Sequence, residues 1–174
     1  MASTTESVQA VDAHGFRRAM ASFATGVNVI TVYDEAGQPH GMTATAFCSV
    51  SVDPPLLLVC VSRDTRTHDR IVSTDRFGVG MLSGGSTKIS DHCARPGADK
   101  RLPAAWLAEG SGARMPVLAS ALAHADCSVH EHQDVGTHTV FIGRVEHLYF
   151  GSETEPLLFF QGSYHRLQRD MADH

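Results

Sequence analysis

The stretch HGMTATAFCSVSVDPPLLLVCV, residues 40–61, is the part of the sequence that most constrains the fold. Residues 47–52 alternate bulky and small side chains, which is typical of a β-strand. Asp53-Pro54-Pro55 ends this strand, because proline has no N–H to donate to a neighbouring strand. Residues 56–61 are almost continuously apolar, as in a strand buried on both faces. We therefore predict two consecutive strands, the first of them extending over residues 42–52.

The middle of the first strand consists of small residues, Thr43, Ala44, Thr45 and Ala46. Side chains of this size do not fill a core, and they leave backbone N–H and C=O groups accessible to a flat molecule. Two interpretations follow. The small residues either allow a close crossing of strands or form a bed for a cofactor ring, and their spacing is compatible with both.

The overall composition indicates one ordinary globular domain. A chain of 174 residues, with 43% hydrophobic and 19% charged residues, is long enough to bury its own core. The net charge of −5 and the scattered Lys and Arg residues argue against a nucleic-acid-binding surface. No apolar stretch approaches the roughly 20 residues of a membrane helix. The first 12 residues lack a basic region followed by an apolar one, so we expect no secretory signal.

The four cysteines are Cys48, Cys60, Cys93 and Cys127, and no two of them form a C-x-x-C pair. Cysteine inside a strand usually acts as a small hydrophobic residue. We therefore predict four free thiols and a reducing, cytoplasmic location.

The 11 histidines raise the question of a metal site. His130 and His132 are two residues apart in an expected strand, which places them on one face. With His138 across the hairpin they could bind Zn²⁺, but a fourth ligand or a water is required and no cysteine has ligand spacing. We interpret them as solvated residues at strand ends and predict no metal.

The remaining elements predict a closed antiparallel barrel, because many short strands are joined by tight turns and the helices lie at the margins. Asp12 is the expected cap of the first helix, and Gly37 is expected to take a positive φ in a hairpin turn. We predict helices at 12–23, 65–73 and 87–94, strands at 27–33, 77–82, 121–131, 137–150, 157–160 and 164–167, turns at 34–37 and 133–136, and a long connection at 96–116 that contains Trp106. The domain is expected to span residues 12–168, between a flexible N-terminus at 1–11 and a C-terminal tail at 169–174.

The junction at residues 62–67, Ser-Arg-Asp-Thr-Arg-Thr, joins an expected strand to an expected helix. Helix N-terminal amides and the guanidinium groups of Arg63 and Arg66 both favour an anion, so the junction is a candidate phosphate site. The alternative is a simple N-cap formed by Asp64.

Several segments together resemble the flavin reductase family, the small reductase components of two-component flavin-dependent monooxygenases. The resemblance runs in the family's order from Phe16 to Leu167, and one chance motif would not extend so far. The segments that carry it are ATGV at 24–27, GMTATAF at 41–47, SVS at 49–51, DPPL at 53–56, GADK at 97–100, THTVFIGRV at 137–145 and GSYH at 162–165.

This resemblance implies a mainly β fold, an antiparallel split β-barrel of the FMN-binding type with a few peripheral helices. It implies an NAD(P)H-dependent flavin reductase that uses FMN or FAD as flavin and NADH or NADPH as reductant. It further implies a homodimer, in which a second subunit completes the flavin bed, and a separate oxygenase that receives reduced flavin. The family uses the region of residues 96–116 as a cover over the cofactor and at the dimer contact. The cofactor-binding positions carried over are Asn28, Thr43, Ala44, Thr45, Ala46, Ser62, Arg63, Thr67 and Tyr164.

The candidate catalytic residue is His138, and it too rests on the resemblance. In the family the turn before this histidine reads glycine-aspartate-histidine-threonine, and the histidine lies near the nicotinamide end of the reductant. Thr137 replaces the aspartate here, so the carboxylate that would orient the imidazole is absent.

Hydride transfer is the chemistry of the two cofactors, so the protein has only to align them and exclude competitors. The sequence is consistent with this, because it shows no Ser-His-Asp set, no paired carboxylates and no Rossmann fingerprint. Two alternatives remain open: a flavin- or haem-binding split-barrel protein without turnover, and a self-contained monooxygenase, which would need a larger substrate pocket.

Overall fold

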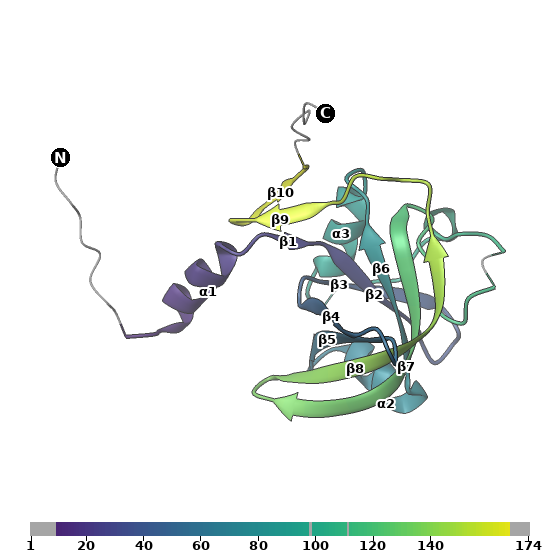
Figure 1. Cartoon of the computed structure of the whole chain (residues 1–174), viewed down its shortest axis with the longest axis horizontal. Helices are drawn as coiled ribbons and strands as arrows, with labels where there is room; N and C mark the ends of the chain where they lie inside the picture. Colours follow the sequence, from purple (N-terminus) through teal and green to yellow (C-terminus); the bar gives the residue numbers. More distant parts are fainter. Residues whose placement is uncertain (1–9, 98, 111, 168–174) are drawn as a thin grey trace.

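The computed structural model describes residues 10–97, 99–110 and 112–167, and its main feature is one curved antiparallel sheet (Figure 1). The strands follow one another across the sheet in the order β3-β2-β6-β7-β8-β5-β4, so β3 and β4 are its two edges. These edges are consecutive in the chain and are joined only by Thr45 and Ala46. The sheet therefore curls into a barrel that is split between β3 and β4, which confirms the predicted split-barrel class. The strands are β2 (Asn28–Tyr33), β3 (Pro39–Ala44), β4 (Phe47–Ser51), β5 (Leu56–Ser62), β6 (Arg76–Leu82), β7 (Ala121–Val135) and β8 (His138–Phe150).

A second sheet of three short strands lies beside one end of the barrel. Its order is β1-β9-β10, with β1 (Thr25–Gly26) paired to β9 (Leu158–Phe160), and β9 paired to β10 (Ser163–His165). The backbone of Leu157 connects the two sheets, because its carbonyl accepts from Val27 at 3.0 Å and its N–H donates to Leu82 at 2.9 Å.

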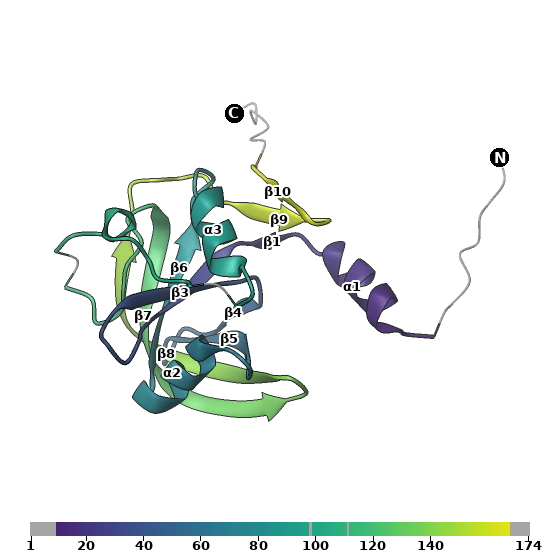
Figure 2. The same ribbon diagram turned by 180° about the vertical axis from the view of Figure 1, so that it is seen from behind.

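Helices α2 (Arg66–Thr74) and α3 (Thr87–Ala94) pack on the barrel, and the short helix η1 (Ala104–Trp106) lies in the connection before β7. Figure 2 shows α3 over β3, on the far side of the molecule from the β7–β8 hairpin tip. The cap of α2 is Thr65, whose hydroxyl accepts from the N–H of His68 at 3.2 Å. The alternative considered for residues 62–67, an N-cap formed by Asp64, is wrong, because the Asp64 carboxylate accepts from the hydroxyl of Ser62 at 2.6 Å.

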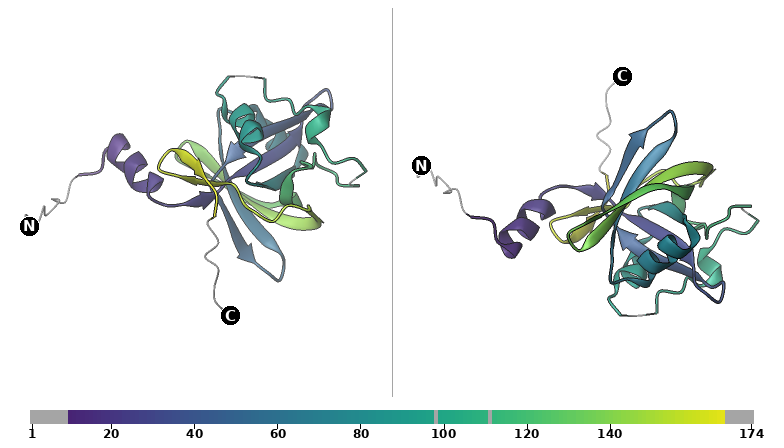
Figure 3. Two further views of the ribbon diagram at one scale, coloured as in Figure 1. Left: turned by 90° about the horizontal axis from the view of Figure 1, so that it is seen from above. Right: turned by 90° about the horizontal axis from the view of Figure 1, so that it is seen from below.

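Helix α1 (Ala13–Ala21) stands apart from the barrel (Figures 1 and 3). Asp12 caps it as predicted, accepting from the N–H of Gly15 at 2.7 Å, but the helix ends at Ala21 and not at residue 23. None of its residues is buried, and Phe16 and Met20 are 56% and 54% exposed.

The core consists of two clusters on opposite faces of the curved sheet. The cluster inside the barrel includes Ile30, Val59, Phe77 and Phe141, and Ile71 of α2 closes one end. The other cluster lies between the sheet, α3 and the segment that precedes β7, and its largest members are Leu82, Leu118 and Leu157.

Three predicted details of the strands are wrong. The strand expected over 42–52 is broken at Thr45 and Ala46, where Phe47 N–H donates to the Thr45 carbonyl at 3.0 Å in a tight turn. Strand β5 alternates between fully and partly buried residues, because only one of its faces packs into the barrel. The β7–β8 turn falls at Gly136, with a φ of 58°, and Thr137, so β7 continues four residues further than expected.

The described helices include none that is long and apolar enough to cross a membrane. Residues 1–9 and 168–174 lie outside the described part, so the predicted N-terminal segment and C-terminal tail fall mostly there. The domain boundaries at 12 and 168 stay predictions.

Candidate flavin site at the seam of the barrel

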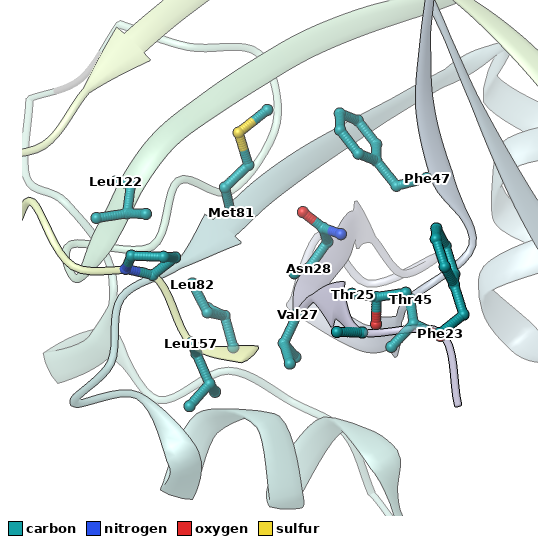
Figure 4. A pocket seen from close by; sticks show the side chains of 13 residues that line it. Phe23, Thr25, Val27, Asn28, Thr45, Phe47, Met81, Leu82, Leu122 and Leu157 are labelled. Atoms are coloured by element: carbon teal, nitrogen blue, oxygen red, sulfur yellow. The ribbon is translucent and has the colours of Figure 1, made fainter. Parts of the chain in front are cut away.

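A cavity of about 410 Å³ opens where the two edges of the barrel meet the second sheet. This volume lies within the range of small-molecule sites, roughly 300–1,000 Å³. Its walls are mostly apolar and come from five separate parts of the chain (Figure 4). They are formed by Phe23, Ala24, Thr25, Gly26, Val27, Asn28, Thr45, Phe47, Met81, Leu82, Leu122, Pro156 and Leu157.

The amide of Asn28 is the main polar group that points into this cavity. Figure 4 shows its side chain directed into the space between Met81 and Phe47. Asn28 is only 5% exposed, and its Nδ2 lies 3.5 Å from the carbonyl of Ala44, a long hydrogen bond. Its carbonyl oxygen and its second N–H therefore remain suited to hydrogen bonds with a polar ring edge.

The break between β3 and β4 forms one rim of the cavity. Thr45 and Ala46 are exposed there, and Thr45 lines the cavity. Ala46 accepts a hydrogen bond from the N–H of Cys60 at 3.2 Å, which ties this rim to β5. A flat ring can approach the backbone at this point, because the side chains are small and the sheet is not continued across the break.

A second group of predicted residues lies further along β5, at the start of α2. Ser62 is two residues beyond Cys60, so it lies on the order of 7 Å along the strand from the rim at Ala46. Arg63 is half-exposed, and its guanidinium donates to the carbonyl of Gly136 at 2.6 Å and lies 3.5 Å from Asp134. Thr67 is 6% exposed and faces the barrel with Ile71, so its side chain serves packing.

Two carboxylates, those of Asp134 and Asp64, lie next to Ser62 and Arg63 and add negative charge to this group. The hydroxyl of Thr139, 2.5 Å away, is the main reason why the pKa of Asp134 is lowered, and Arg63 adds to the effect. The hydroxyl of Ser62 likewise lowers the pKa of Asp64. Both carboxylates are thus charged near neutral pH, and a phosphate at this position has to compete with Asp134 for Arg63.

His138 begins β8 directly after the hairpin turn and is exposed, as predicted from its position. It is the register partner of Ser62, and its Nδ1 lies 2.9 Å from the hydroxyl of Thr137. From the rim at Ala46 it is two strands across, through β5, and two residues along, on the order of 12 Å. The hydroxyl that replaces the family's carboxylate thus does contact the imidazole.

Thr43 and Tyr164 form a third group, and both contact Ser90 of α3. The Thr43 hydroxyl donates to the Ser90 carbonyl at 2.7 Å, and the Tyr164 hydroxyl contacts the Ser90 hydroxyl at 2.9 Å and Asp91 at 2.8 Å. Burial is the main reason why the pKa of Tyr164 is raised. Tyr164 lies two strands from Thr25, which lines the cavity, at roughly 10 Å.

Of the predicted residues, the structure places Asn28 and Thr45 in the cavity wall and Ala44 and Ala46 next to Thr45 in the chain, and the others form two groups around the cavity. Sequence reasoning missed Met81, Leu122 and Pro156. Met81 reaches the cavity because it is the register partner of Asn28 across β2 and β6. No local pattern in the sequence marks these three positions.

The histidine cluster considered from the sequence does not form a metal site in the part of the chain that the structure describes, where no group of three or more His, Cys, Asp or Glu residues is placed to hold a metal ion. A β-bulge between Val129 and Glu131 interrupts the alternation that would put His130 and His132 on one face. His132 instead packs against Phe141, with ring centroids 5.8 Å apart.

Comparison with known proteins identifies the family. A family model described as a flavin reductase like domain matches residues 20–168. The chain is 38% identical to an NADH-dependent FAD reductase of Streptomyces globisporus, over 98% of this chain and 94% of that protein. It is 39% identical to a flavin reductase (NADH) of Kitasatospora aureofaciens, over 90% of this chain and 82% of that protein. The solved structure of the styrene monooxygenase flavin reductase from Pseudomonas putida S12 is 35% identical, with a TM-score of 0.79 over 90% of this chain and 99% of that one.

The structure is a split barrel with a mostly apolar cavity at its seam. The chain belongs to the flavin reductase family. It is an NAD(P)H:flavin oxidoreductase, so the reductase interpretation of the sequence is confirmed and the flavin and nicotinamide cofactors with it.

Proposed function

We propose that the flavin ring binds in the cavity at the barrel seam, with Asn28 and the Thr45–Ala46 backbone at its polar edge. The observation that carries this proposal is the buried Asn28 amide directed into a cavity whose other walls are apolar. A flavin ring has the same character, with apolar faces and hydrogen-bonding groups along one edge. The cavity thus fits the group on both size and chemistry.

The bound cofactors supply the hydride chemistry, from the nicotinamide ring to the flavin. The residues of the chain bind the cofactors, orient them and shield them from water. Phe47, Met81 and Leu122 exclude water from the ring, and Asn28 fixes its orientation. We propose NADH as the reductant, since both curated relatives described above are named for NADH. We also propose that His138 contacts the nicotinamide nucleotide, because it is exposed on the hairpin near the rim of the cavity.

The flavin phosphate is proposed to bind at the start of α2, next to Ser62 and Arg63. Arg63→Ala is expected to weaken FMN about tenfold while leaving riboflavin nearly unchanged, because only FMN carries the phosphate. This is the low end of the roughly 1.5–3 kcal/mol of a charge-assisted hydrogen bond, since Arg63 is already bonded to Gly136 and Asp134. Equal losses for the two ligands would remove Arg63 from the phosphate site.

The active form is proposed to be a homodimer. Helix α1 exposes Phe16 and Met20, four residues apart on one helical face, and Phe23 follows them into the wall of the cavity. A second copy that covers this face would also complete the site. Sedimentation equilibrium should give a dimer at micromolar concentration, and Phe16→Ser combined with Met20→Ser should shift it towards monomer with loss of activity. A fully active monomer would contradict the proposal.

Reduced flavin is proposed to pass to a separate oxygenase, the role that the name of the styrene monooxygenase reductase gives to that relative. A cytoplasmic location is proposed as well, because the four cysteines are free thiols.

The direct test of the proposed function is to mix the purified chain with NADH and FMN or FAD in air and to follow the nicotinamide absorbance. Rapid loss of absorbance that depends on both flavin and protein is expected. Binding of flavin without turnover would instead support the non-catalytic alternative.

A further inference from the structure

A cluster of buried polar groups lies on the face of the sheet that the segment before β7 covers. Every buried side-chain nitrogen or oxygen that lacks a hydrogen-bond partner among the described residues belongs to it. These atoms are Thr31 Oγ1, both ring nitrogens of His124 and Asp126 Oδ1. The three residues are at most 1% exposed.

The register of the sheet explains why these atoms lie together. Gly78 of β6 is the direct partner of Thr31 on one side and of Asp126 on the other, so the three positions form a row across β2, β6 and β7. His124 is two residues from Asp126 along β7 and therefore points to the same face.

Two glycines leave the space that the cluster occupies. A Cβ at Gly78 would lie 2.6 Å from His124 Nε2 and closer still to Thr31 Oγ1, and one at Gly80 would lie 3.5 Å from His124 Nδ1. Neither glycine has a positive φ, so the backbone does not require glycine at these positions. At Gly78 the room taken by the imidazole and the hydroxyl requires glycine, whereas the 3.5 Å contact at Gly80 is an ordinary van der Waals distance.

The carboxylate of Asp126 has two differently placed oxygens. Oδ2 accepts from the backbone N–H of Arg114 at 2.8 Å and lies 3.9 Å from His147 Nδ1, at the outer margin of the cluster. Oδ1 is the oxygen without a protein partner. The Arg114 bond also holds the covering segment against the sheet, and Leu118 closes the cluster near Gly80.

Leaving these groups without partners would lower the folding equilibrium constant by roughly five- to hundredfold for each group. Internal water molecules in proteins typically make about three hydrogen bonds to such groups. Water can donate to Asp126 Oδ1 and to the unprotonated ring nitrogen of His124, and it can accept from the Thr31 hydroxyl.

We propose that Thr31, His124 and Asp126 form a binding site for internal water, which the segment around Arg114 seals against the sheet. The ligand is water and not a metal ion, because the cluster contains only two metal-ligating side chains and the described residues hold no group of three. None of these three residues lines the proposed flavin cavity.

Thr31→Val tests the proposal, because valine matches threonine in shape and lacks the hydroxyl. If the hydroxyl bonds to internal water, its loss should destabilise the fold. Urea unfolding should then show a folding equilibrium constant roughly three- to tenfold lower than in the wild type. A hydroxyl without any partner gives the opposite result, since its replacement is neutral or stabilising. Thr139→Val is the reference for a hydroxyl whose bonds are satisfied, because the Thr139 hydroxyl is buried and bonded to Asp134 and to His68 Nε2.

A high-resolution crystal structure of the wild type supplies the second measurement. The proposal expects a solvent peak within hydrogen-bond distance of Thr31 Oγ1 and of a His124 ring nitrogen or Asp126 Oδ1, and its loss or displacement in Thr31→Val. A missing peak, a peak with the anomalous signal of a metal, or a Thr31→Val variant as stable as the wild type would each overturn it.

Discussion

The side-chain amide of Asn28 lies 3.5 Å from the carbonyl of Ala44, its direct register partner across β2 and β3. The Asn28 amide therefore lies at the terminal residue pair of β2 and β3, immediately before the chain turns at Thr45. Because the hydrogen bond is long, the amide is held loosely by the protein and stays available to a ligand.

Replacing Asn28 should therefore affect flavin binding more than folding. Asn28→Leu is expected to raise the flavin dissociation constant several-fold, the loss of one hydrogen bond worth about 0.5–1.5 kcal/mol, and to change the free energy of unfolding by less than about 1 kcal/mol. Fluorescence titration and urea unfolding measure the two quantities. Met42→Leu, an apolar change at a buried position of β3 outside the cavity lining, is the control and should leave flavin affinity within about twofold.

Thr45→Leu tests the rim of the cavity. The added bulk falls where a ring would lie against the backbone, and overpacking of about 1–3 kcal/mol corresponds to a roughly five- to hundredfold loss of flavin affinity. The fold should survive, because Thr45 is exposed. Ser49→Leu, at an exposed position on β4, controls for added surface hydrophobicity. A Thr45→Leu variant that binds FMN normally would show that this strand break is not the flavin bed.

His138→Ala separates nicotinamide handling from flavin handling. Loss of one neutral hydrogen bond, about 0.5–1.5 kcal/mol, should slow anaerobic flavin reduction by NADH several-fold while the flavin dissociation constant stays within about twofold. We expect the low end, because Thr137 contacts the imidazole in place of a carboxylate. Stopped-flow measurements give both quantities. Collapse of flavin affinity, or unchanged reduction, would make His138 a structural residue.

Acid should destabilise the fold through His124. Burial lowers the pKa of His124 from 6.5 to about 4, so the unfolded chain binds a proton at a higher pH than the folded one. Stability that is fully present above pH 6.5 is therefore lost as the pH falls from about 6.5 to about 4, up to about 3 kcal/mol. Urea unfolding across this range measures the slope, which His124→Leu should reduce. The same substitution at exposed His165 should retain it, and an unchanged slope in His124→Leu would show that another group is responsible.

Local sequence patterns predicted helix ends, turns and strand ends correctly where a single residue type determines the backbone conformation. Asp12 caps α1, Gly37 takes a φ of 73°, and Asp53-Pro54-Pro55 separates β4 from β5. The alternative of an Asp64 cap for α2 is wrong although Asp64 and Thr65 are both good caps, because the choice depends on Asp64 being bonded to Ser62.

The site could be predicted only in part, for a physical reason. The strand break at Thr45 depends on how the sheet curls, and the walls at Met81 and Leu122 depend on strand register, so neither is encoded near Asn28 in the sequence. Arg63 illustrates the same limit, because its partner Gly136 is 73 residues away.

The two-residue connection between β3 and β4 also has a consequence for how the barrel holds together. Both edge strands of the large sheet meet at Thr45 and Ala46, so no strand pairing joins β3 to β4 across this seam in the described part of the chain. A flavin ring bound in the cavity would contact residues from both sides of the seam, such as Asn28 and Phe47. Flavin binding should therefore protect backbone amides on both sides of the seam from hydrogen exchange together.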